Sequence, residues 1–391
     1  MEENSKRETV ELRKSTLVLL FCLCGVLAVG TGVGIYRAYA SQAEYGELAQ
    51  LKATVEANYY TDVDEESTMQ GAMKGYVAGL DDPYSQYLTD EEYGEFQTNE
   101  AGRTVGIGVT VTPTKEGYLL INSVTADSPA EAAGLQSEDE IIAVDGEDVA
   151  ELGYSSAVDA VRGEENTSVI LTIRRDDTTL DCEVTRKNME VITAQGQMLD
   201  GNIGYIRISA FKENTPEQYQ AVYEQLVNQG AEGLIFDLRD NGGGLVNSLE
   251  KILDPLLPEG EIAIATYRDG HTQTLVQSDA EECDLPMVVL VNENTASAAE
   301  LFTASLRDFG KAKAVGTTTF GKGIMQVTQP MFSGALTLTV ATYQTTKGEC
   351  YHGVGITPDV VVDAGEEPVD YDAPDAVSDP QLAKALELII E

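Results

Sequence analysis

Residues 287–300 read Met-Val-Val-Leu-Val-Asn-Glu-Asn-Thr-Ala-Ser-Ala-Ala-Glu, and the rest of the chain can be placed around this stretch. The apolar residues 287–291 predict a buried strand, and residues 298–309, closed by Gly310, have the apolar spacing of a helix. Ser297 therefore falls at a strand-to-helix turn, in the first turn of the helix. Backbone N–H groups there lack intrahelical acceptors and can face a developing negative charge.

A serine hydroxyl is a weak nucleophile until a base removes its proton. The chain has two histidines, His271 and His352, and either could serve in a Ser-His-Asp arrangement. A lysine can also be the base, because burial disfavours its charged form and lowers its pKa. The candidate is Lys322, which lies between two glycines in the run Thr-Phe-Gly-Lys-Gly-Ile-Met-Gln, residues 319–326. Taken alone, a serine at a helix start is more often an N-cap than a nucleophile.

Together the two motifs resemble the active-site region of the carboxyl-terminal processing proteases, the PDZ-containing Ser-Lys peptidases of the tail-specific type. That family shows Asn-x-x-(Ser/Thr)-Ala-Ser-Ala-x-Glu, followed at a comparable spacing by Thr-Phe-Gly-Lys-Gly-x-x-Gln. The resemblance implies that Ser297 is the nucleophile, that Lys322 is the general base, and that Gln326 orients the lysine. It implies neither a metal nor a cofactor.

A second glycine-rich turn follows another predicted buried strand, residues 233–238. It reads Arg-Asp-Asn-Gly-Gly-Gly, residues 239–244, and it lacks the pattern of a P-loop. In the resembling proteases the corresponding Asp-Leu-Arg-x-Asn-Pro-Gly-Gly turn lends a glycine N–H to the oxyanion hole. The resemblance implies Ala298 as one donor and either Gly243 or Gly244 as the other. Gly242 stands where the family has proline.

Residues 99–190 contain short alternating strands and several phrases that resemble a PDZ domain, among them Ser-Pro-Ala-Glu-Ala-Ala-Gly-Leu at 128–135. The run Gly106-Ile107-Gly108-Val109 resembles the carboxylate-binding loop of such a domain. The resemblance implies that a peptide adds as a strand while backbone N–H groups of this loop hold its terminal carboxylate. Taken alone, such glycines more often only shape a hairpin. Glu138 lies at a point where the family often has glycine.

The net charge limits the classes of binding partner, and the N-terminal residues indicate where in the cell the protein lies. Lys+Arg 25 against Asp+Glu 66 gives a net charge of −41, which excludes a general nucleic-acid or anionic-membrane surface. Residues 16–36 carry no charge and are long enough to span a bilayer. The basic residues before them predict a cytoplasmic tail at 1–15 and a catalytic body outside the cytoplasm. The alternative is a signal peptide cleaved near Ala40 and a secreted protein.

The predicted fold is α/β (α+β) and multidomain, with the transmembrane helix at 16–36. A helical region at 37–98 precedes the PDZ domain at 99–190, a crotonase-like mixed α/β protease core at 191–363, and an acidic exposed linker with a C-terminal helix at 364–391. The predicted activity is that of a membrane-anchored serine endopeptidase which captures polypeptide substrates by their C-terminus, with a homo-oligomer as an expected assembly. The alternatives are a non-catalytic PDZ peptide-binding scaffold and a crotonase-like acyl enzyme.

Overall fold

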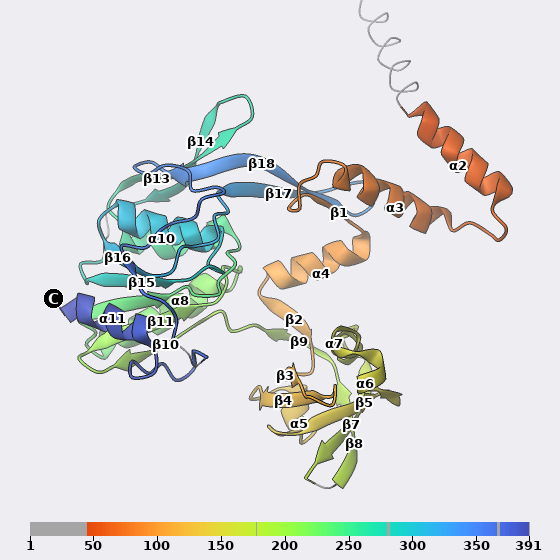
Figure 1. Ribbon diagram of the computed structural model, residues 1–391, viewed down its shortest axis with the longest axis horizontal. Coiled ribbons are helices and arrows are strands. Elements are labelled where there is room, and N and C mark those ends of the chain that lie inside the picture. Colours follow the sequence, from red (N-terminus) through yellow and green to blue (C-terminus); the bar gives the residue numbers. More distant parts are fainter. Residues whose placement is uncertain (1–44, 177, 280–281, 366–367, 391) are drawn as a thin grey trace, which may run out of the picture. The chain divides into compact units, whose positions relative to one another are not determined.

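The computed structural model describes residues 45–176, 178–279, 282–365 and 368–390 (Figure 1). They divide into two compact units, 1–75 and 76–391, and each is described by itself. The predicted cytoplasmic tail, the predicted membrane anchor and the alternative cleavage site near Ala40 all lie outside the described residues. Within the described ranges, no helix is long and apolar enough to cross a membrane.

The first unit contains α2 (Gly46–Asn58) and most of α3 (Glu65–Ala78). Lys52 of α2 pairs with Glu56 one turn further on and with Glu65 at the start of α3, at 2.7 and 3.0 Å. No residue of α2 is buried. Packing within the described part of this unit therefore leaves the apolar side chains of α2 exposed, apart from the partly covered Val55.

In the second unit, β1 (Gln86–Leu88) and α4 (Asp90–Glu100) precede the predicted PDZ region. Thr89 caps α4 with a reciprocal pair of hydrogen bonds: its Oγ1 accepts from the N–H of Glu92, and its N–H donates to the Glu92 carboxylate. The two-stranded ladder of β2 (Arg103–Gly106) and β9 (Lys187–Glu190) then brackets the PDZ region at its start and its end.

The predicted PDZ region is a six-stranded antiparallel sheet in the order β3–β4–β5–β7–β8, with β6 beside β5. Strand β7 alternates exposed and buried side chains, as a sheet with one covered face requires. Strand β3 pairs with β4 alone among the described strands, so its other edge is free. The elements are β3 (Val109–Pro113), β4 (Leu119–Val124), α5 (Pro129–Ala132), β5 (Glu140–Val144), β6 (Glu147–Asp148), α6 (Val149–Leu152), α7 (Tyr154–Val161), β7 (Ser168–Arg175) and β8 (Thr178–Thr185).

The predicted protease core is built on a second six-stranded sheet in the order β10–β11–β12–β15–β16–β19. Strand β10 is antiparallel to β11, and the remaining pairs are parallel. Strands β11, β12 and β15 are buried along their whole length, as expected for a sheet covered on both faces. The elements are β10 (Ala194–Leu199), β11 (Ile203–Ile208), α8 (Thr215–Asn228), β12 (Gly233–Asp237), α9 (Val246–Leu253), β15 (Met287–Val291), α10 (Ala298–Asp308), β16 (Ala312–Gly316) and β19 (Val360–Val361).

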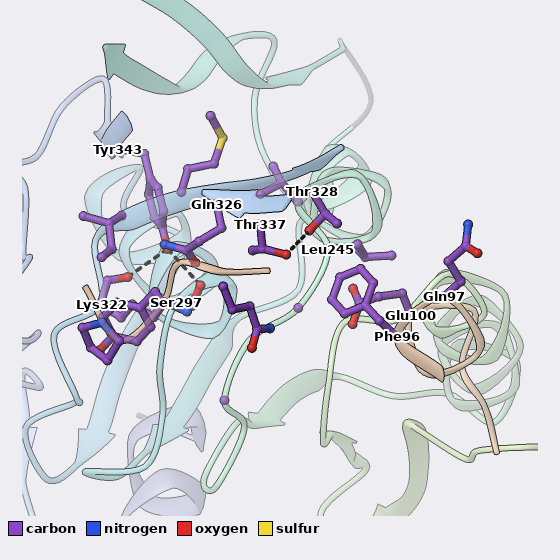
Figure 2. A pocket seen from close by; sticks show the side chains of 18 of the residues that line it. Phe96, Gln97, Glu100, Leu245, Ser297, Lys322, Gln326, Thr328, Thr337 and Tyr343 are labelled. Carbon is purple, nitrogen blue, oxygen red and sulfur yellow. Dashed lines mark hydrogen bonds between the residues drawn. The ribbon is translucent and has the colours of Figure 1, made fainter. Parts of the chain in front are cut away.

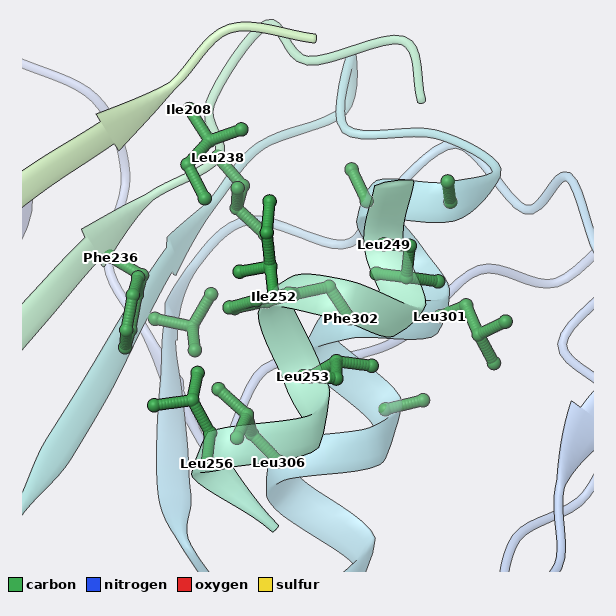
Figure 3. Close-up of a cluster of buried hydrophobic side chains, with 14 of the residues drawn as sticks. Ile208, Phe236, Leu238, Leu249, Ile252, Leu253, Leu256, Leu301, Phe302 and Leu306 are labelled. Carbon is green, nitrogen blue, oxygen red and sulfur yellow. The ribbon is translucent and has the colours of Figure 1, made fainter. Parts of the chain in front are cut away.

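Neighbouring residues of the core strands belong to different hydrophobic clusters. Phe236 and Val289 pack with α8, α9 and α10, whereas Ile235 and Val288 pack with α11 (Pro380–Ile390). Figure 3 shows the first cluster, in which Leu249 and Ile252 of α9 meet Phe302 of α10. Each fully buried side chain of this size stabilises the fold by about 1.5–3 kcal/mol. The clusters hold α10, and with it Ser297, rigidly against the sheet.

A further sheet has the order β1–β18–β13–β14, with β17 paired to β18. Strand β17 begins two residues after Lys322, and a register shift lies between Met325 and Gln326. The sheet therefore places β17, which follows Lys322, at one edge of β18 and β1, which precedes α4, at the other. Its other strands are β13 (Gly260–Tyr267), β14 (Thr272–Ser278), β17 (Ile324–Pro330) and β18 (Ala335–Thr345), and the 3-10 helix η1 (Asp254–Leu256) precedes β13.

The predicted C-terminal helix is α11, and its predicted cap, Asp379, accepts hydrogen bonds from the N–H groups of Gln381 and Leu382 at 3.0 Å each. Most of the described residues of 364–378 are exposed, as the linker interpretation expects, but Tyr371 is an exception. Tyr371 is half-buried, and its ring lies on the guanidinium of Arg207. The acidic composition of the segment concealed this contact.

Candidate active site

Ser297 follows the turn after β15 and precedes α10, as its sequence context predicts. Its φ is +56°, a left-handed conformation that is costly for a residue with a side chain. Buried hydrogen bonds impose it: Thr295 Oγ1 donates to the carbonyl of Leu238 at 2.9 Å, and Ala296 N–H donates to the carbonyl of Asn241 at 2.9 Å. The turn is thereby fixed to the loop after β12, and Ser297 faces the cleft described below.

The carboxylate of Glu300 connects the Ser297 turn with the Lys322 turn. It is fully buried. Its Oε2 accepts from the N–H groups of Ser297 and Lys322 at 2.9 and 2.7 Å. Its Oε1 accepts from the N–H of Gly321 at 2.7 Å and from the hydroxyl of Thr319 at 2.5 Å. Four donors thus take the place of a cation, and they stabilise a charge that would otherwise be very costly to bury.

Lys322 lies in a close-packed turn, as its two glycine neighbours suggest. A methyl group at Gly323 would lie 3.0 Å from the backbone nitrogen of His352, and Gly321 has a φ of +91°. Burial lowers the pKa of the Lys322 amine, while the carboxylate of Asp82 acts in the opposite direction. The Lys322 Nζ lies 4.3 Å from the centre of the Tyr84 ring. The direction of this shift is the one that a general base at neutral pH requires.

Tyr343 connects the nucleophile and the lysine turn directly. Its hydroxyl lies 3.2 Å from Ser297 Oγ and 2.9 Å from the carbonyl oxygen of Lys322, and it can donate to either (Figure 2). Burial raises the pKa of this phenol, so it remains protonated and able to donate. Sequence reasoning missed Tyr343, since a tyrosine in a β pattern is usually a packing residue.

Gln326 does not contact Lys322 in this structure. Its Nε2 donates to Thr339 Oγ1 on the paired strand β18 at 3.1 Å. Within the described residues, the Lys322 amine has no hydrogen-bond acceptor, and its partner is the Tyr84 ring. The structure therefore brings the predicted residues Ser297, Lys322 and Gln326 to one cleft without joining their side chains.

The glycine turn lies against the nucleophile. A methyl group at Gly243 would lie 2.7 Å from Ser297 Cβ and 2.9 Å from the backbone nitrogen of Ala298. The N–H of Gly243 donates to Asn241 Oδ1 at 2.8 Å, whereas Gly244 lines the cleft. Among the described residues, the N–H groups of Ala298 and Gly244 have no acceptor. Of the two predicted glycines, Gly244 is thus the one with a free donor.

These residues share a cleft of about 820 Å³. One wall is β17 with Tyr343 and the other is α4 (Figure 2). Neither His271 nor His352 lines it: His271 is exposed and stacked on Tyr267 in the β13–β14 hairpin, and His352 is exposed. The lining residues contributed by the α4 side are Pro83, Tyr84, Gln86, Tyr93, Phe96, Gln97 and Glu100.

The predicted carboxylate loop lies between β2 and β3. Gly106 ends β2, Ile107 is buried in the PDZ core, and Val109 starts the free-edged β3. Gly108 has a φ of +88°, and a methyl group there would lie 2.3 Å from Ser128 Cβ. The four residues therefore form a tight loop at the start of a free strand edge, which is the geometry that strand addition needs.

Glu138 has a φ of +71°, which explains why glycine suits this point. The next residue, Asp139, is buried and pairs with Arg175 through both of its carboxylate oxygens, at 2.6 and 2.7 Å. The unusual residue therefore adds backbone strain and leaves the neighbouring ion pair intact. Across the described residues, no group of three or more His, Cys, Asp or Glu is placed to hold a metal ion.

Several regions of the chain are similar to known proteins. The profile of peptidase family S41 matches residues 202–362, that of a PDZ domain matches 120–175, and that of the N-terminal domain of the activating protease CtpB matches 36–92. The carboxy-terminal processing protease CtpA of Bacillus subtilis (strain 168) is 34% identical over 331 residues, which are 84% of this chain and 71% of the relative.

A second relative is the "Probable CtpA-like serine protease" of Staphylococcus aureus (strain MSSA476). It is 32% identical over 326 residues, 82% of this chain and 65% of the relative. Among solved structures, a Bacteroides fragilis protein assigned to the S41 proteases superposes with a TM-score of 0.54 at 18% identity, over 85% of this chain and 91% of that one. This last similarity concerns the fold.

Proposed function

Because this chain belongs to peptidase family S41 and is a serine peptidase of that family, we propose that Ser297 and Lys322 form its catalytic pair. One observation carries the proposal: Glu300 holds the N–H groups of both residues on a single buried oxygen at the edge of one cleft. The two histidines lie outside the cleft lining, so an imidazole base finds no support here. The desolvated amine of Lys322 is the proposed base instead.

In the proposed reaction, the neutral Lys322 amine accepts the proton of Ser297 as Oγ attacks the scissile carbonyl carbon. The C–N bond then breaks, and the Lys322 ammonium gives its proton to the leaving amine. The resulting acyl-enzyme is hydrolysed by a water that Lys322 deprotonates in the same way. The N–H groups of Ala298 and Gly244 stabilise the oxyanion, and losing one such donor typically costs about 10²–10³ in rate.

Catalysis requires the Lys322 amine to leave the Tyr84 ring and approach Ser297 Oγ. We propose that a torsional change of the flexible lysine side chain brings the amine there, because the main chains of both residues are already fixed to Glu300. Gln326 would then orient the amine from β17. We propose that the structure represents a resting arrangement and that peptide binding to the PDZ domain favours the active one.

The proposed substrates are polypeptides captured by their C-terminus. The carboxylate would bind the N–H groups of the Gly106–Val109 loop, and the preceding residues would add to the free edge of β3. Gly108→Ala tests this role, since the added methyl group would collide with Ser128. If the loop is the site, the substitution should abolish binding of a labelled C-terminal peptide. Amidating the peptide's carboxylate should abolish binding to the wild-type protein in the same way.

We also propose that residues 16–36 anchor the chain in the membrane with the catalytic body outside the cytoplasm. The uncharged run and the basic residues before it support this orientation. N-terminal sequencing of the protein from cells separates the anchor from its alternative. A mature chain starting near residue 41 would mean a cleaved signal peptide and a secreted enzyme. The assembly expected is a homo-oligomer, which size measurements in solution would test.

The decisive experiment is digestion of an unstructured protein, such as alkylated casein, by the full chain. Ser297→Ala and Lys322→Ala should each abolish cleavage, and Lys322→Arg should do so as well, because a guanidinium stays protonated. His352→Ala serves as the matched control and should cleave like the wild type. Cleavage that survives Lys322→Ala but is lost with His352→Ala would replace the proposed base with histidine.

A further inference from the structure

Asp240 joins the two turns that frame Ser297. Its Oδ1 accepts from the side-chain amides of Asn292 and Asn294 at 2.8 Å each. Its own N–H donates to Asn292 Oδ1 at 2.9 Å. The two asparagines belong to the turn that leads to Ser297, and Asp240 begins the glycine turn. The carboxylate therefore fixes one turn to the other.

The glycine turn depends on such external contacts for its shape. Asp240 itself has a φ of +61°, and three consecutive glycines, residues 242–244, follow one residue later. Glycine backbones explore more conformations than any other residue, so hydrogen bonds must fix these three. The Gly243 N–H donates to Asn241 Oδ1 at 2.8 Å, and the Gly243 carbonyl accepts from the Phe211 N–H at 2.9 Å. The position of the Gly244 N–H is set by these bonds together with those that hold Asp240 at the start of the turn.

One of these contacts comes from a distant part of the chain. The hydroxyl of Tyr371 donates to Asp240 Oδ2 at 2.5 Å, across 131 residues of sequence. The Tyr371 ring stacks on Arg207, with the guanidinium carbon 3.4 Å from the ring centre. Arg207 in turn donates to the carbonyl of Arg239 at 3.1 Å, immediately before Asp240. Tyr371 thus contacts Asp240 directly and is linked through Arg207 to the carbonyl of the preceding residue.

The segment that carries Tyr371 is itself held firmly. Arg239 is buried and pairs with Asp237 and, at 2.8 Å, with Asp379 at the start of α11. It also donates to Gln381 Oε1 at 3.0 Å. Breaking a buried ion pair is costly, so this anchorage is stable. These bonds anchor the chain at the start of α11, eight residues after Tyr371.

We propose that Tyr371 is a positioning residue for the peptidase reaction: its hydroxyl holds Asp240, and through Asp240 it keeps the glycine turn in register with Ser297. The inference rests on the proposed function, since it concerns the oxyanion donor Gly244. The hydrogen bond also affects ionisation. Burial would raise the pKa of the Asp240 carboxyl, but the bonds from Tyr371, Asn294 and Asn292 outweigh it and keep the pKa below its usual value. The acceptor therefore stays charged, which strengthens the contact.

Tyr371→Phe in the full chain isolates the hydroxyl, because phenylalanine keeps the ring on Arg207. A displaced oxyanion donor lowers kcat and leaves binding intact, so we expect kcat on alkylated casein to fall between about 3- and 30-fold with KM within about twofold. The rate at which a fluorophosphonate modifies Ser297 should fall in parallel. The matched control is Tyr267→Phe, which removes a phenol hydrogen bond to Gln273 in the exposed β13–β14 hairpin and should leave both rates unchanged.

A double-mutant cycle tests whether Tyr371 acts through Asp240. Asp240→Asn keeps an acceptor for the two asparagines, and combining it with Tyr371→Phe should cost less than the two single effects multiplied together. The proposal is overturned if Tyr371→Phe leaves kcat unchanged, if its effects multiply fully with those of Asp240→Asn, or if the fall in kcat equals a loss of folded protein measured by thermal unfolding. Ser297→Ala in the same assay tests the proposed function separately. If the Ser297→Ala protein still cleaves casein, the proposed function is refuted regardless of the result for Tyr371→Phe.

Discussion

The backbone N–H groups of Ser297 and Lys322 donate to the same atom, Oε2 of Glu300. Their main chains are therefore held at a fixed separation even though their side chains do not touch. Such a shared acceptor lets the lysine side chain move without disturbing the turn that carries it. It also makes the geometry of the pair depend on a residue that never meets substrate.

Glu300→Gln is expected to impair both rate and stability. The amide keeps one acceptor oxygen but turns an NH2 group toward two of the four donors that face the carboxylate. We expect the unfolding free energy to fall by about 1–3 kcal/mol, and kcat by about 10- to 100-fold in the fraction that remains folded. Denaturant titration and active-site titration measure the two separately.

The control for this change is Glu293→Gln. Glu293 also accepts from a threonine hydroxyl, that of Thr317 at 2.9 Å, but it is exposed. Its substitution should change neither quantity appreciably. A Glu300→Gln enzyme with wild-type kcat would show that the shared oxygen does not set the geometry of the pair.

The activity should rise with pH as Lys322 loses its proton. Burial lowers the pKa of the amine and Asp82 raises it. Removing the Asp82 charge disfavours the ammonium further, so Asp82→Asn should move the rising limb of kcat to lower pH. A series of kcat measurements against pH for both enzymes checks the direction. Asp269→Asn, which removes an exposed carboxylate beside His271, should leave the limb in place. A shift to higher pH would contradict the assignment of this limb to Lys322.

Tyr343→Phe should slow catalysis because it removes the only side-chain hydrogen bond that Ser297 Oγ receives within the described residues. We expect kcat to fall by about 5- to 20-fold, the size of one moderate hydrogen bond. Tyr219→Phe is the comparison, since the Tyr219 hydroxyl is buried in the core, away from the cleft, without a hydrogen-bond partner among the described residues. That change should preserve kcat and leave stability equal or higher. Equal kcat for the wild type and Tyr343→Phe would remove Tyr343 from the mechanism.

Glu138→Gly should stabilise the PDZ region. Glu138 adopts a φ of +71°, which glycine tolerates without strain. We expect the unfolding free energy to increase by about 0.5–1 kcal/mol in denaturant titrations. Glu116→Gly, in a turn where the glutamate does not have a positive φ, should instead lose a little stability. If Glu138→Gly lowered the unfolding free energy as much as Glu116→Gly, the positive φ of Glu138 would not be a source of strain.

The core elements were predictable because their signals are local. Five consecutive apolar residues gave β15, the apolar spacing before Gly310 gave α10, and Asp379 with the pattern after it gave α11. The predictions of these elements rely on periodicity and on backbone chemistry, which the sequence displays directly. The grouping of Ser297, Lys322 and Gln326 came from the family resemblance, and all three line one cleft.

The contacts that hold the site were not predictable in this way. The hydroxyls of Tyr343 and Tyr371 act on residues far away in the chain, and neither stands in a motif. Gln326 appeared to be a partner of Lys322, but the register shift before it points its amide at Thr339. Such pairings depend on tertiary packing, for which a single sequence carries no periodic signal.

The anchoring of Arg239 has a consequence for biosynthesis. Arg239 leaves the ribosome 142 residues before Gln381, and until then the buried guanidinium lacks two of its partners, Asp379 and Gln381. A nascent chain therefore cannot form the contacts of Arg239, the residue before the glycine turn segment Asp240–Gly244, with Asp379 and Gln381 until both have been synthesised. Translation itself delays the moment at which this polypeptide could begin to cut its neighbours.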